Sequence, residues 1–390
     1  MKKISIKKKI SFFFIFFFLI IIIIEIFLRL ISIEYPIFQK HDPIRGFSLL
    51  PNSKGIWTRE GRGEVKINSM GLRDYEHTID KPSDILRIAI LGDSYAEARS
   101  VNLEETFWFK LGKNLKNCKS FHKGKKIEVI NFGVSEYGTT QQYLTLKNHV
   151  WKYNPDIILL AFYSGNDISD NLKILSTKKY RPYFEFEGDK IKSIDKDYLK
   201  SKPYEILSSY YGQLFIKLSQ YSRIAQLFRE SYVQMYFASK RKSNLNLNKK
   251  ANKSEANLYN PNDEPWAKAW IVTEKIIKLI DKDVREKNKD FILVSLSNAI
   301  QVYPSITYLK DYKKKNNIDN IFYPENRLAK FSKKNKIKVL SISQIMRKEA
   351  LEKKIFFHGF YNTKLGTGHW NETGHDFASK LISKGICKLY

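Results

Sequence analysis

Five short apolar runs alternate with longer stretches of helical periodicity, and this alternation constrains the fold more than any other feature of the chain. The apolar runs are 87–91, 127–132, 156–163, 291–296 and 337–342. Short runs with no polar alternation are typical of strands that are buried on both faces. Because helical stretches separate most of the runs, we predict an α/β protein with a doubly wound parallel sheet and helices on both of its faces.

The helical stretches between and after these runs have the 3.6-residue spacing of amphipathic helices. They are Glu104–Leu115, Gln141–Tyr153, Trp266–Glu286, Asn326–Asn335 and Thr373–Lys388. Residues 32–84 precede the first strand and are rich in turn residues such as the Gly61-Arg62-Gly63 sequence. We interpret this segment as a β-rich collar in front of one domain of residues 85–390.

A long insertion, residues 171–265, interrupts the alternation of strands and helices. It begins with a predicted hairpin at Tyr183–Ile194 and continues into an aromatic helical stretch at Tyr204–Phe237. The aromatic residues fit either helix packing or a wall over the site that stacks on sugar rings. A tract rich in Lys, Asn and Ser at about 240–257 is predicted to be disordered.

The N-terminus combines a basic segment, residues 1–9, with an apolar segment, residues 10–31. The apolar segment has enough residues for a helix to cross a hydrocarbon core of about 30 Å. A cleaved signal peptide has the same basic-then-apolar pattern, but no site with small residues follows. We therefore favour an uncleaved, single-pass signal anchor in the inner or plasma membrane. Its lysines would lie in the cytoplasm and the remaining chain outside, in the periplasm or at the cell surface.

The net charge of the 390-residue chain is +28, from 68 Lys and Arg against 40 Asp and Glu. Residues 1–40 account for +5 of this charge, and +23 remains on residues 41–390. The remaining lysines are scattered, often beside Asn, and no nucleic-acid motif or zinc knuckle accompanies them. We interpret the charge as a solvated surface and expect no nucleic-acid partner.

Polar motifs follow the predicted strands at the edge where a parallel sheet presents its carboxyl ends. Gly92-Asp93-Ser94 follows the first strand and Ser164-Gly165-Asn166-Asp167 follows the third. Gly368-His369-Trp370 stands immediately before the last helix. Ser, Asn and His placed at this edge are the residue types that nucleophilic acyl transfer needs. We expect the two aspartates to hold loops and not to take part in the reaction.

These blocks, in this order, resemble those of the SGNH (GDSL) hydrolases, a superfamily of flavodoxin-like α/β/α serine esterases and acyltransferases. The resemblance covers about residues 66–175 and 266–388. It extends to Asn68-Ser-Met-Gly71-Leu-Arg-Asp74, which is similar to a stretch of membrane-anchored members in bacterial polysaccharide loci. The fold that the resemblance implies is a three-layer α/β/α sandwich around a flavodoxin-like parallel sheet.

The resemblance also implies roles for individual residues. Ser94 would be the nucleophile and His369 the general base. The oxyanion hole would consist of the Ser94 backbone N–H and the Asn166 side-chain amide. A third donor, usually a Gly five residues after an Asn at the end of the second strand (here Asn131), falls on Glu136, whose backbone N–H would serve only in a strained conformation.

The chain departs from the family where the triad acid is expected, because Thr367 and Gly366 occupy the positions two and three residues before His369. Three explanations stay open. A Ser–His dyad would orient its imidazole through a backbone carbonyl near Gly366, Thr367 Oγ1 would substitute for the acid, or an acid from elsewhere in the chain would reach Nδ1. A slow or inactive enzyme is a further consequence of losing the acid.

The function that follows is an anchored, extracytoplasmic serine esterase that removes O-acyl groups, O-acetyl above all, from a glycan. Two alternatives stay open: an O-acyltransferase that uses the same residues, and a degenerate glycan-binding protein of an assembly machinery. The expected partners are an acylated glycan and the membrane, and the chemistry requires no metal or nucleotide cofactor. Cys118 and Cys387 either form a disulfide in an oxidising compartment or remain two buried thiols.

Overall fold

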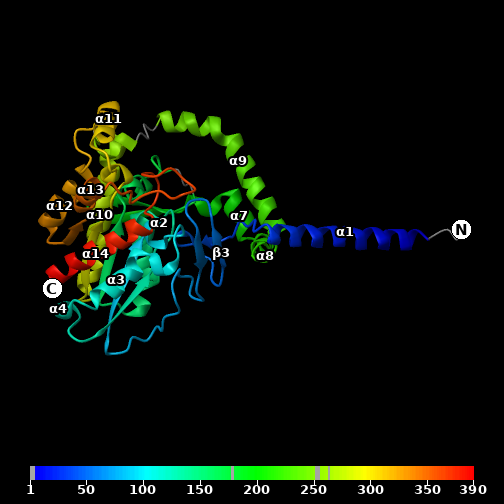
Figure 1. Ribbon diagram of the computed structural model, residues 1–390, viewed down its shortest axis with the longest axis horizontal. Helices are drawn as coiled ribbons and strands as arrows, with labels where there is room; N and C mark the ends of the chain where they lie inside the picture. Colours follow the sequence, from blue (N-terminus) through cyan, green and yellow to red (C-terminus); the bar gives the residue numbers. More distant parts are fainter. Residues whose placement is uncertain (1–4, 177–179, 251–254, 262–263) are drawn as a thin grey trace.

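A five-stranded parallel sheet forms the centre of the molecule (Figure 1). The computed structural model describes residues 5–176, 180–250, 255–261 and 264–390. The strands are β5 (Ile85–Gly92), β6 (Lys126–Asn131), β7 (Ile157–Phe162), β10 (Asp290–Ser295) and β11 (Lys338–Ser341). Their spatial order is β11-β10-β7-β5-β6, which is the 2-1-3-4-5 order of flavodoxin-like sheets. All five predicted strands and the parallel α/β fold are therefore confirmed.

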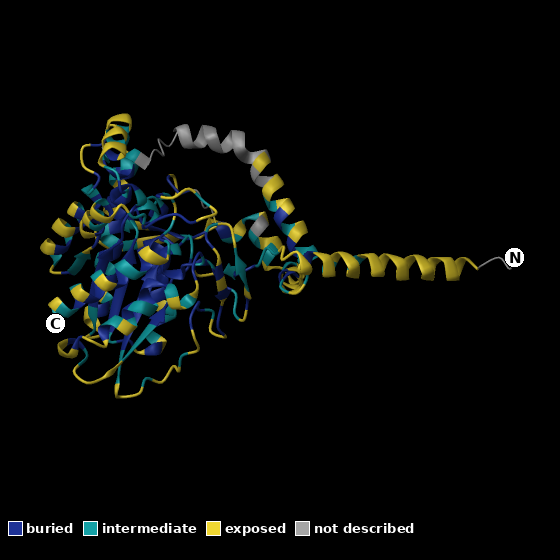
Figure 2. Cartoon of the chain, viewed as in Figure 1, coloured by how far each residue is buried: buried dark blue, intermediate teal, exposed yellow. Residues whose placement is uncertain are grey.

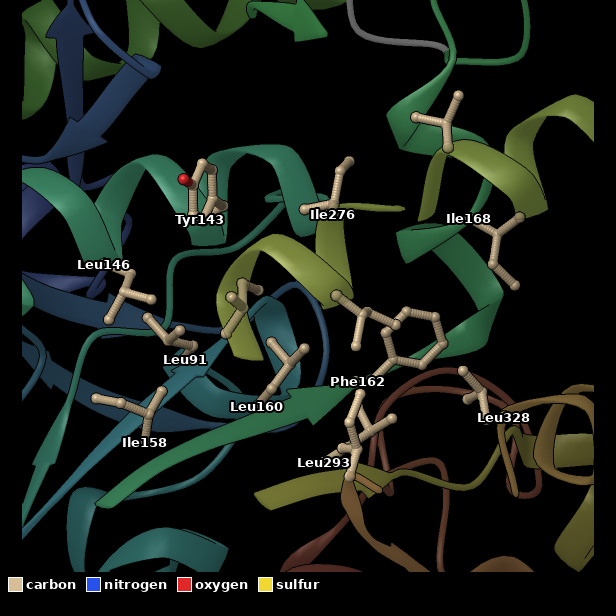
Figure 3. Close-up of a cluster of buried hydrophobic side chains, with 14 of the residues drawn as sticks. Leu91, Tyr143, Leu146, Ile158, Leu160, Phe162, Ile168, Ile276, Leu293 and Leu328 are labelled. Carbon is tan, nitrogen blue, oxygen red and sulfur yellow. The ribbon is translucent and has the colours of Figure 1, made fainter. Parts of the chain in front are cut away.

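Helices cover both faces of the sheet and complete the three layers. One face packs against α5 (Thr139–Asn148), α10 (Glu264–Glu286) and α12 (Tyr323–Asn335). The other packs against α3 (Phe107–Leu115), α13 (Ser343–Lys353) and α14 (Glu372–Leu389). Figure 3 shows the first of these cores, in which Leu91, Leu160 and Leu293 from three strands meet Tyr143 and Ile276. Because neighbouring strand residues point to opposite faces, Ile88 and Ile90 belong to the other core.

The five predicted helices are present, and the structure adds others that the sequence pattern did not reveal. The longest additions are α13 and α11 (Ile306–Asn316). Leu309 is the one buried residue of α11, so the sequence of this helix has almost no apolar stripe from which to predict it. The short helices are α2 (Ser94–Glu97), α4 (Lys119–His122) and α6 (Ser164–Asp167), with 3₁₀ turns at Leu103–Glu105, Val150–Tyr153, Ser169–Asn171, Asp197–Lys200, Glu255–Leu258 and Ala299–Val302.

The segment before the first sheet strand folds as two antiparallel hairpins. The first pairs β1 (Gln39–Asp42) with β2 (Gly46–Leu49), and the second pairs β3 (Lys54–Trp57) with β4 (Gly63–Lys66). The fully buried Arg73 follows them and donates from Nη2 to the carbonyl oxygen of Val101 at 2.6 Å. This bond joins the collar to the polypeptide that follows β5, and so to the carboxyl edge of the sheet.

The described residues of the insertion contain a hairpin and three α-helices ahead of α10. The hairpin pairs β8 (Tyr183–Glu187) with β9 (Lys190–Asp195), as predicted. The helices are α7 (Lys202–Ser208), α8 (Tyr210–Ser219) and α9 (Arg223–Lys250). Of the tract predicted to be disordered, 240–257, the structure describes α9 through Lys250 and a 3₁₀ turn from Glu255; residues 251–254 lie outside the described residues, and the disorder stays a prediction. Extending a helix that already exists costs much less than nucleating one, so a polar tract can continue α9.

Helix α1 (Ile6–Leu30) extends away from the domain with its apolar side chains exposed (Figures 1 and 2). It is long and apolar enough to cross a membrane, and a signal sequence would meet the same two criteria. Its last turns contact the insertion. The Glu25 carboxylate accepts hydrogen bonds from the backbone N–H groups of Arg223 at 2.9 Å and Ile224 at 3.1 Å, at the start of α9.

Cys118 and Cys387 form a disulfide, with their Cα atoms 5.8 Å apart. Cys118 lies between α3 and α4 and Cys387 lies in α14, so the bond joins two elements on the same face of the sheet. It links residues separated by 269 positions in sequence. Of the two states that the sequence left open, the structure contains the disulfide.

Breaking this disulfide is expected to destabilise the domain. A cross-link over so long a loop restricts the unfolded chain strongly, so Cys387→Ser should lower the free energy of unfolding by about 2–5 kcal/mol. Urea denaturation followed by tryptophan fluorescence measures the change. Reductant should shift the midpoint of the natural protein in the same direction and leave that of Cys387→Ser unchanged. Equal midpoints for oxidised and reduced natural protein would contradict the prediction.

Candidate active site

Ser94 lies at the carboxyl end of β5, in the turn that leads into α2. The Asp93 side chain caps this short helix by accepting a hydrogen bond from the Tyr95 N–H at 2.9 Å. Asp93 and Tyr95 are buried, whereas the Ser94 side chain is partly exposed. The strand, the cap and the buried neighbours therefore hold the Ser94 hydroxyl at the edge of the sheet.

His369 reaches Ser94 from the loop before α14. Its Nε2 lies 2.8 Å from Ser94 Oγ, so the two residues form a hydrogen bond over 275 positions of sequence. The Tyr95 ring packs against the imidazole with ring centroids 5.1 Å apart. The structure therefore brings together the serine and the histidine that the motifs singled out.

Glu60 supplies the carboxylate that the sequence pattern lacked. It lies in the turn between β3 and β4, and its Oε2 contacts His369 Nδ1. Its Oε1 accepts a hydrogen bond from the His369 backbone N–H at 2.7 Å. Thr367 Oγ1 donates instead to the Lys364 carbonyl oxygen at 2.6 Å. Of the three explanations for the missing acid, the structure contains the third, an acid from a distant part of the chain.

Asn362 holds the hairpin turn that carries Glu60. Its Nδ2 donates to the carbonyl oxygens of Thr58 at 2.9 Å and Gly61 at 3.0 Å, and its Oδ1 accepts from the Gly61 N–H at 2.9 Å. Gly368, beside the histidine, has a φ of +73°, and a Cβ there would lie 2.0 Å from Glu60 Oε1. Only glycine fits this position, because the carboxylate approaches the backbone so closely.

The charges of Glu60 and His369 stabilise each other. Burial alone would lower the pKa of His369, but the hydrogen bond and the negative charge of Glu60 outweigh it and raise that pKa above its ordinary value. Burial would likewise raise the pKa of Glu60, and the His369 contacts outweigh burial and lower it. The pair therefore favours a carboxylate beside an imidazole that accepts a proton readily.

A second buried histidine supports the loop that carries His369. His358 Nδ1 lies 2.8 Å from the Gly368 carbonyl oxygen, and its Nε2 lies 3.3 Å from Ser297 Oγ. Burial lowers the pKa of His358 to about 4, so it is neutral at physiological pH. A neutral imidazole with Nδ1 protonated donates to the carbonyl oxygen and helps to fix the backbone directly before His369.

Asn166 lies beside Ser94 in one cavity of about 430 Å³. It follows β7, the strand next to β5, so the two residues flank the point where the strand order of the sheet reverses. The cavity is lined by Ser94, Tyr95, Tyr163, Asn166, Ala299, Ile300, Tyr308, Tyr312, Gly366, Thr367, Gly368 and His369.

Asp93 and Asp167 are fully buried beneath this cavity and hold its loops, as expected. Asp167 accepts hydrogen bonds from the Tyr163 N–H at 2.8 Å and from Gln142 Nε2 at 2.9 Å. Burial raises the pKa of Asp93 to about 6. Burial and the neighbouring Asp93 carboxyl raise the pKa of Asp167 well above its ordinary value. Both carboxyl groups accept hydrogen bonds from backbone N–H groups, and Asp167 also accepts one from the Gln142 amide.

Glu136 is not among the residues that line the cavity. Its φ is +72°, a left-handed conformation that is strained for a residue other than glycine. Its carbonyl oxygen accepts a hydrogen bond from Arg181 Nη2 at 2.6 Å, which stabilises this conformation. The structure therefore brings Ser94, Asn166 and His369 together and leaves Glu136 outside the cavity wall.

The arrangement has the parts of a serine nucleophile, a base and an orienting acid. Sequence reasoning missed Glu60 because it is 309 residues from His369 and belongs to a different element. The sequence does contain a signal for this contact, because a glycine stands beside each of the two residues. Gly61 follows Glu60, and Gly368 precedes His369. Within the described residues, no group of three or more His, Cys, Asp or Glu side chains has the geometry to hold a metal ion.

Comparison with known proteins gave only structural similarity. No family model and no curated protein matches the chain. An acetyl xylan esterase of known structure is 12% identical, with 76% of this chain and 97% of that one covered and a TM-score of 0.36. A GDSL-like lipase from Bacteroides thetaiotaomicron is 13% identical, with 80% and 93% covered and a TM-score of 0.34. A two-domain esterase active on acetylated mannans is 10% identical, with 78% and 50% covered and a TM-score of 0.35.

Proposed function

We propose that this chain is an SGNH-type serine ester hydrolase that removes acyl groups, most simply acetyl, from a carbohydrate. The observation that carries the proposal is the unbroken line of contacts from Ser94 Oγ to His369 Nε2 and from His369 Nδ1 to Glu60. Such a line is the arrangement by which a serine hydroxyl becomes a nucleophile near neutral pH.

In the proposed reaction, Ser94 Oγ attacks the ester carbonyl carbon while His369 Nε2 takes the hydroxyl proton. Glu60 keeps Nδ1 protonated and stabilises the imidazolium that forms. The Ser94 N–H and the Asn166 amide donate to the oxyanion of the tetrahedral intermediate. His369 then protonates the departing sugar oxygen, the C–O bond breaks, and an acyl-Ser94 ester remains. Water, deprotonated by His369, attacks this ester; the bond between the acyl carbon and Ser94 Oγ breaks, His369 returns the proton to Oγ, and the carboxylic acid leaves.

The walls of the cavity support a sugar ester as the substrate. Tyr163, Tyr308 and Tyr312 lie around the nucleophile, and aromatic rings of this kind pack against sugar rings while their hydroxyl groups form hydrogen bonds. Tyr308 is 39% exposed, so this side of the cavity is reached from solvent. A compact acyl group fits beside Ser94, and the rest of a glycan can extend outward.

The proposed location is outside the cytoplasm, on a single membrane helix. Lys7, Lys8 and Lys9 precede the apolar part of α1, which favours a cytoplasmic N-terminus. The disulfide between Cys118 and Cys387 belongs to an oxidising compartment. The domain that follows α1 would then meet glycans in the periplasm or at the cell surface.

Acetate release from a partially acetylated xylan by the purified full-length chain in detergent tests this proposal. The hydrolase is expected to release free acetate and to form an adduct with a fluorophosphonate probe on Ser94, detected by peptide mass spectrometry. A non-acetylated oligosaccharide added as acceptor distinguishes the alternatives. Transfer of labelled acetyl to that acceptor in place of acetate release would support the acyltransferase. Glycan binding with neither reaction would support the degenerate binding protein.

Asn166 provides a further test of the oxyanion site. Asn166→Ala should lower kcat about 10²–10³-fold with little change in KM, because the amide acts mainly on charge that develops in the transition state. Steady-state kinetics on 4-nitrophenyl acetate measures both constants. Asn335→Ala is the matched control, since that amide donates to the Phe331 carbonyl oxygen of its own helix and does not line the cavity. A proportional rise in KM with unchanged kcat would instead assign Asn166 to ground-state binding.

A further inference from the structure

Helix α8 presents its apolar side outward. Tyr210, Tyr211, Leu214, Phe215 and Leu218 are all exposed, Tyr211 by 80%. At 100° per residue these five positions occupy one face of the helix. The buried residues of α8 are Ile216 and Ser219, on the opposite side. A helix of a water-soluble domain normally buries its larger apolar face, so α8 has the reverse arrangement.

The first turns of α9 repeat this arrangement. Phe228, Tyr232 and Met235 follow the i, i+4, i+7 spacing of one helix face, and each is at least 70% exposed. The buried positions on the other side are polar, Gln226 and Glu230. We give the name aromatic platform to the exposed apolar residues described above. They are Tyr210, Tyr211, Leu214, Phe215 and Leu218 of α8, Phe228, Tyr232 and Met235 of α9, and Tyr221 between the two helices.

The aromatic platform lies at the base of α1 (Figures 1 and 2). Glu25 of α1 accepts the hydrogen bonds that start α9, and the Arg29 guanidinium donates to the Tyr221 carbonyl oxygen. Glu25 is five residues, or about 7.5 Å along a helix, before the end of α1. If α1 crosses a bilayer from the basic residues at its start, the junction of α8 and α9 lies in the outer acyl region, just below the lipid headgroups.

We propose that the aromatic platform rests in the headgroup and outer acyl region of the same bilayer that α1 crosses. The proposal depends on the membrane span of α1, which belongs to the proposed function. Tyr and Phe side chains are suited to this depth, where an aromatic ring contacts acyl chains and a hydroxyl contacts water. Lys217 of α8 is exposed, and Arg29 is half-exposed, so both can pair with lipid phosphates.

The contact would hold the domain in one orientation over the membrane. Glu230, on the buried side of α9, pairs with Arg59 at 2.6 Å, and Arg59 directly precedes Glu60. The platform is thus joined by an ion pair to the hairpin that carries the acid of the candidate active site. A bilayer is favoured over a glycan as the occupant because the platform is continuous with α1 and lies outside the cavity that contains Ser94.

Depth-dependent fluorescence quenching in the full-length protein tests the platform. The protein is reconstituted into vesicles of phosphatidylethanolamine and phosphatidylglycerol, and an environment-sensitive dye is attached at Tyr211→Cys or Phe228→Cys. The natural cysteines are joined in a disulfide and do not react without reductant. Phe17→Cys in α1 reports the membrane span, and Lys313→Cys in α11 is the control far from it. Acetate release by each labelled protein verifies that it is folded.

Spin-labelled lipids with the label near the headgroup should quench the dyes at positions 211 and 228 at least about twofold more than the dye at position 313. The dye at position 17 should respond best to lipids labelled deep in the acyl chain. Quenching at position 17 but not at 211 and 228 would overturn the platform and leave the membrane span intact. Absence of quenching at all sites would overturn both. The proposal would also be overturned if added glycan or a second copy of the chain, and not lipid, changed the fluorescence of the dyes at positions 211 and 228.

Discussion

The substitution Glu60→Gln is expected to lower kcat for ester hydrolysis about 10³–10⁴-fold with little change in KM. The amide of Gln can donate to His369 Nδ1 and so stabilise the tautomer that carries its proton on Nε2. That tautomer cannot accept the proton of Ser94. Gln has nearly the shape of Glu, so the hairpin should keep its place and the loss should come from the protonation state. Steady-state kinetics on 4-nitrophenyl acetate measures the effect.

The pH profile separates this role from a structural one. Glu60 raises the pKa of His369, and the base must be neutral to act, so activity of the natural protein falls as the pH drops through this raised value. Without the carboxylate, burial remains and lowers the pKa. The acid limb of kcat/KM should therefore move to lower pH in Glu60→Gln.

Glu64→Gln is the matched control in the same hairpin. The Glu64 carboxylate is mostly exposed and pairs with Lys66 at 2.9 Å, away from His369. Its substitution should leave both kcat and the acid limb unchanged. A similar loss in both variants, or an unmoved acid limb in Glu60→Gln, would assign Glu60 to the stability of the collar and not to His369.

Ser94→Ala is expected to lower kcat about 10⁴–10⁶-fold, because it removes the atom that would form the acyl-enzyme. Labelling by the fluorophosphonate probe should be lost with it. Ser94 is partly exposed at a strand end, so losing one oxygen should leave the fold intact, and an unchanged circular dichroism melt verifies this. Adding Glu60→Gln to Ser94→Ala should cost little more, since residues that act as one unit are not additive.

Ser341→Ala is the control for the nucleophile. Ser341 ends β11 at the same carboxyl edge of the sheet and is exposed, but it does not line the cavity. This variant should retain full activity and full labelling by the probe. If Ser94→Ala hydrolyses the ester at the same rate as Ser341→Ala, Ser94 is not the nucleophile.

The sheet and its helices were predictable because they depend on local patterns. An apolar run such as 157–162 has few alternatives to a buried strand, and the long stripe of α10 has few alternatives to a helix against the sheet. The reversed faces of α8 and α9 were harder to interpret. Their aromatic residues predict helices correctly, but burial depends on what lies beside each face, and a sequence does not record that.

The sequence by itself determined the parallel α/β fold, the apolar N-terminal helix and the positions of Ser94, Asn166 and His369 at the edge of the sheet. Each depends on periodicity or on a motif next to a strand or a helix, and both are properties of neighbouring residues. Only the tertiary structure decided which acid serves His369. The chain has 40 acidic residues, and the partner of Nδ1 is selected by distance in space. That selection depends on how the collar hairpin folds back over the sheet, 309 residues away in sequence.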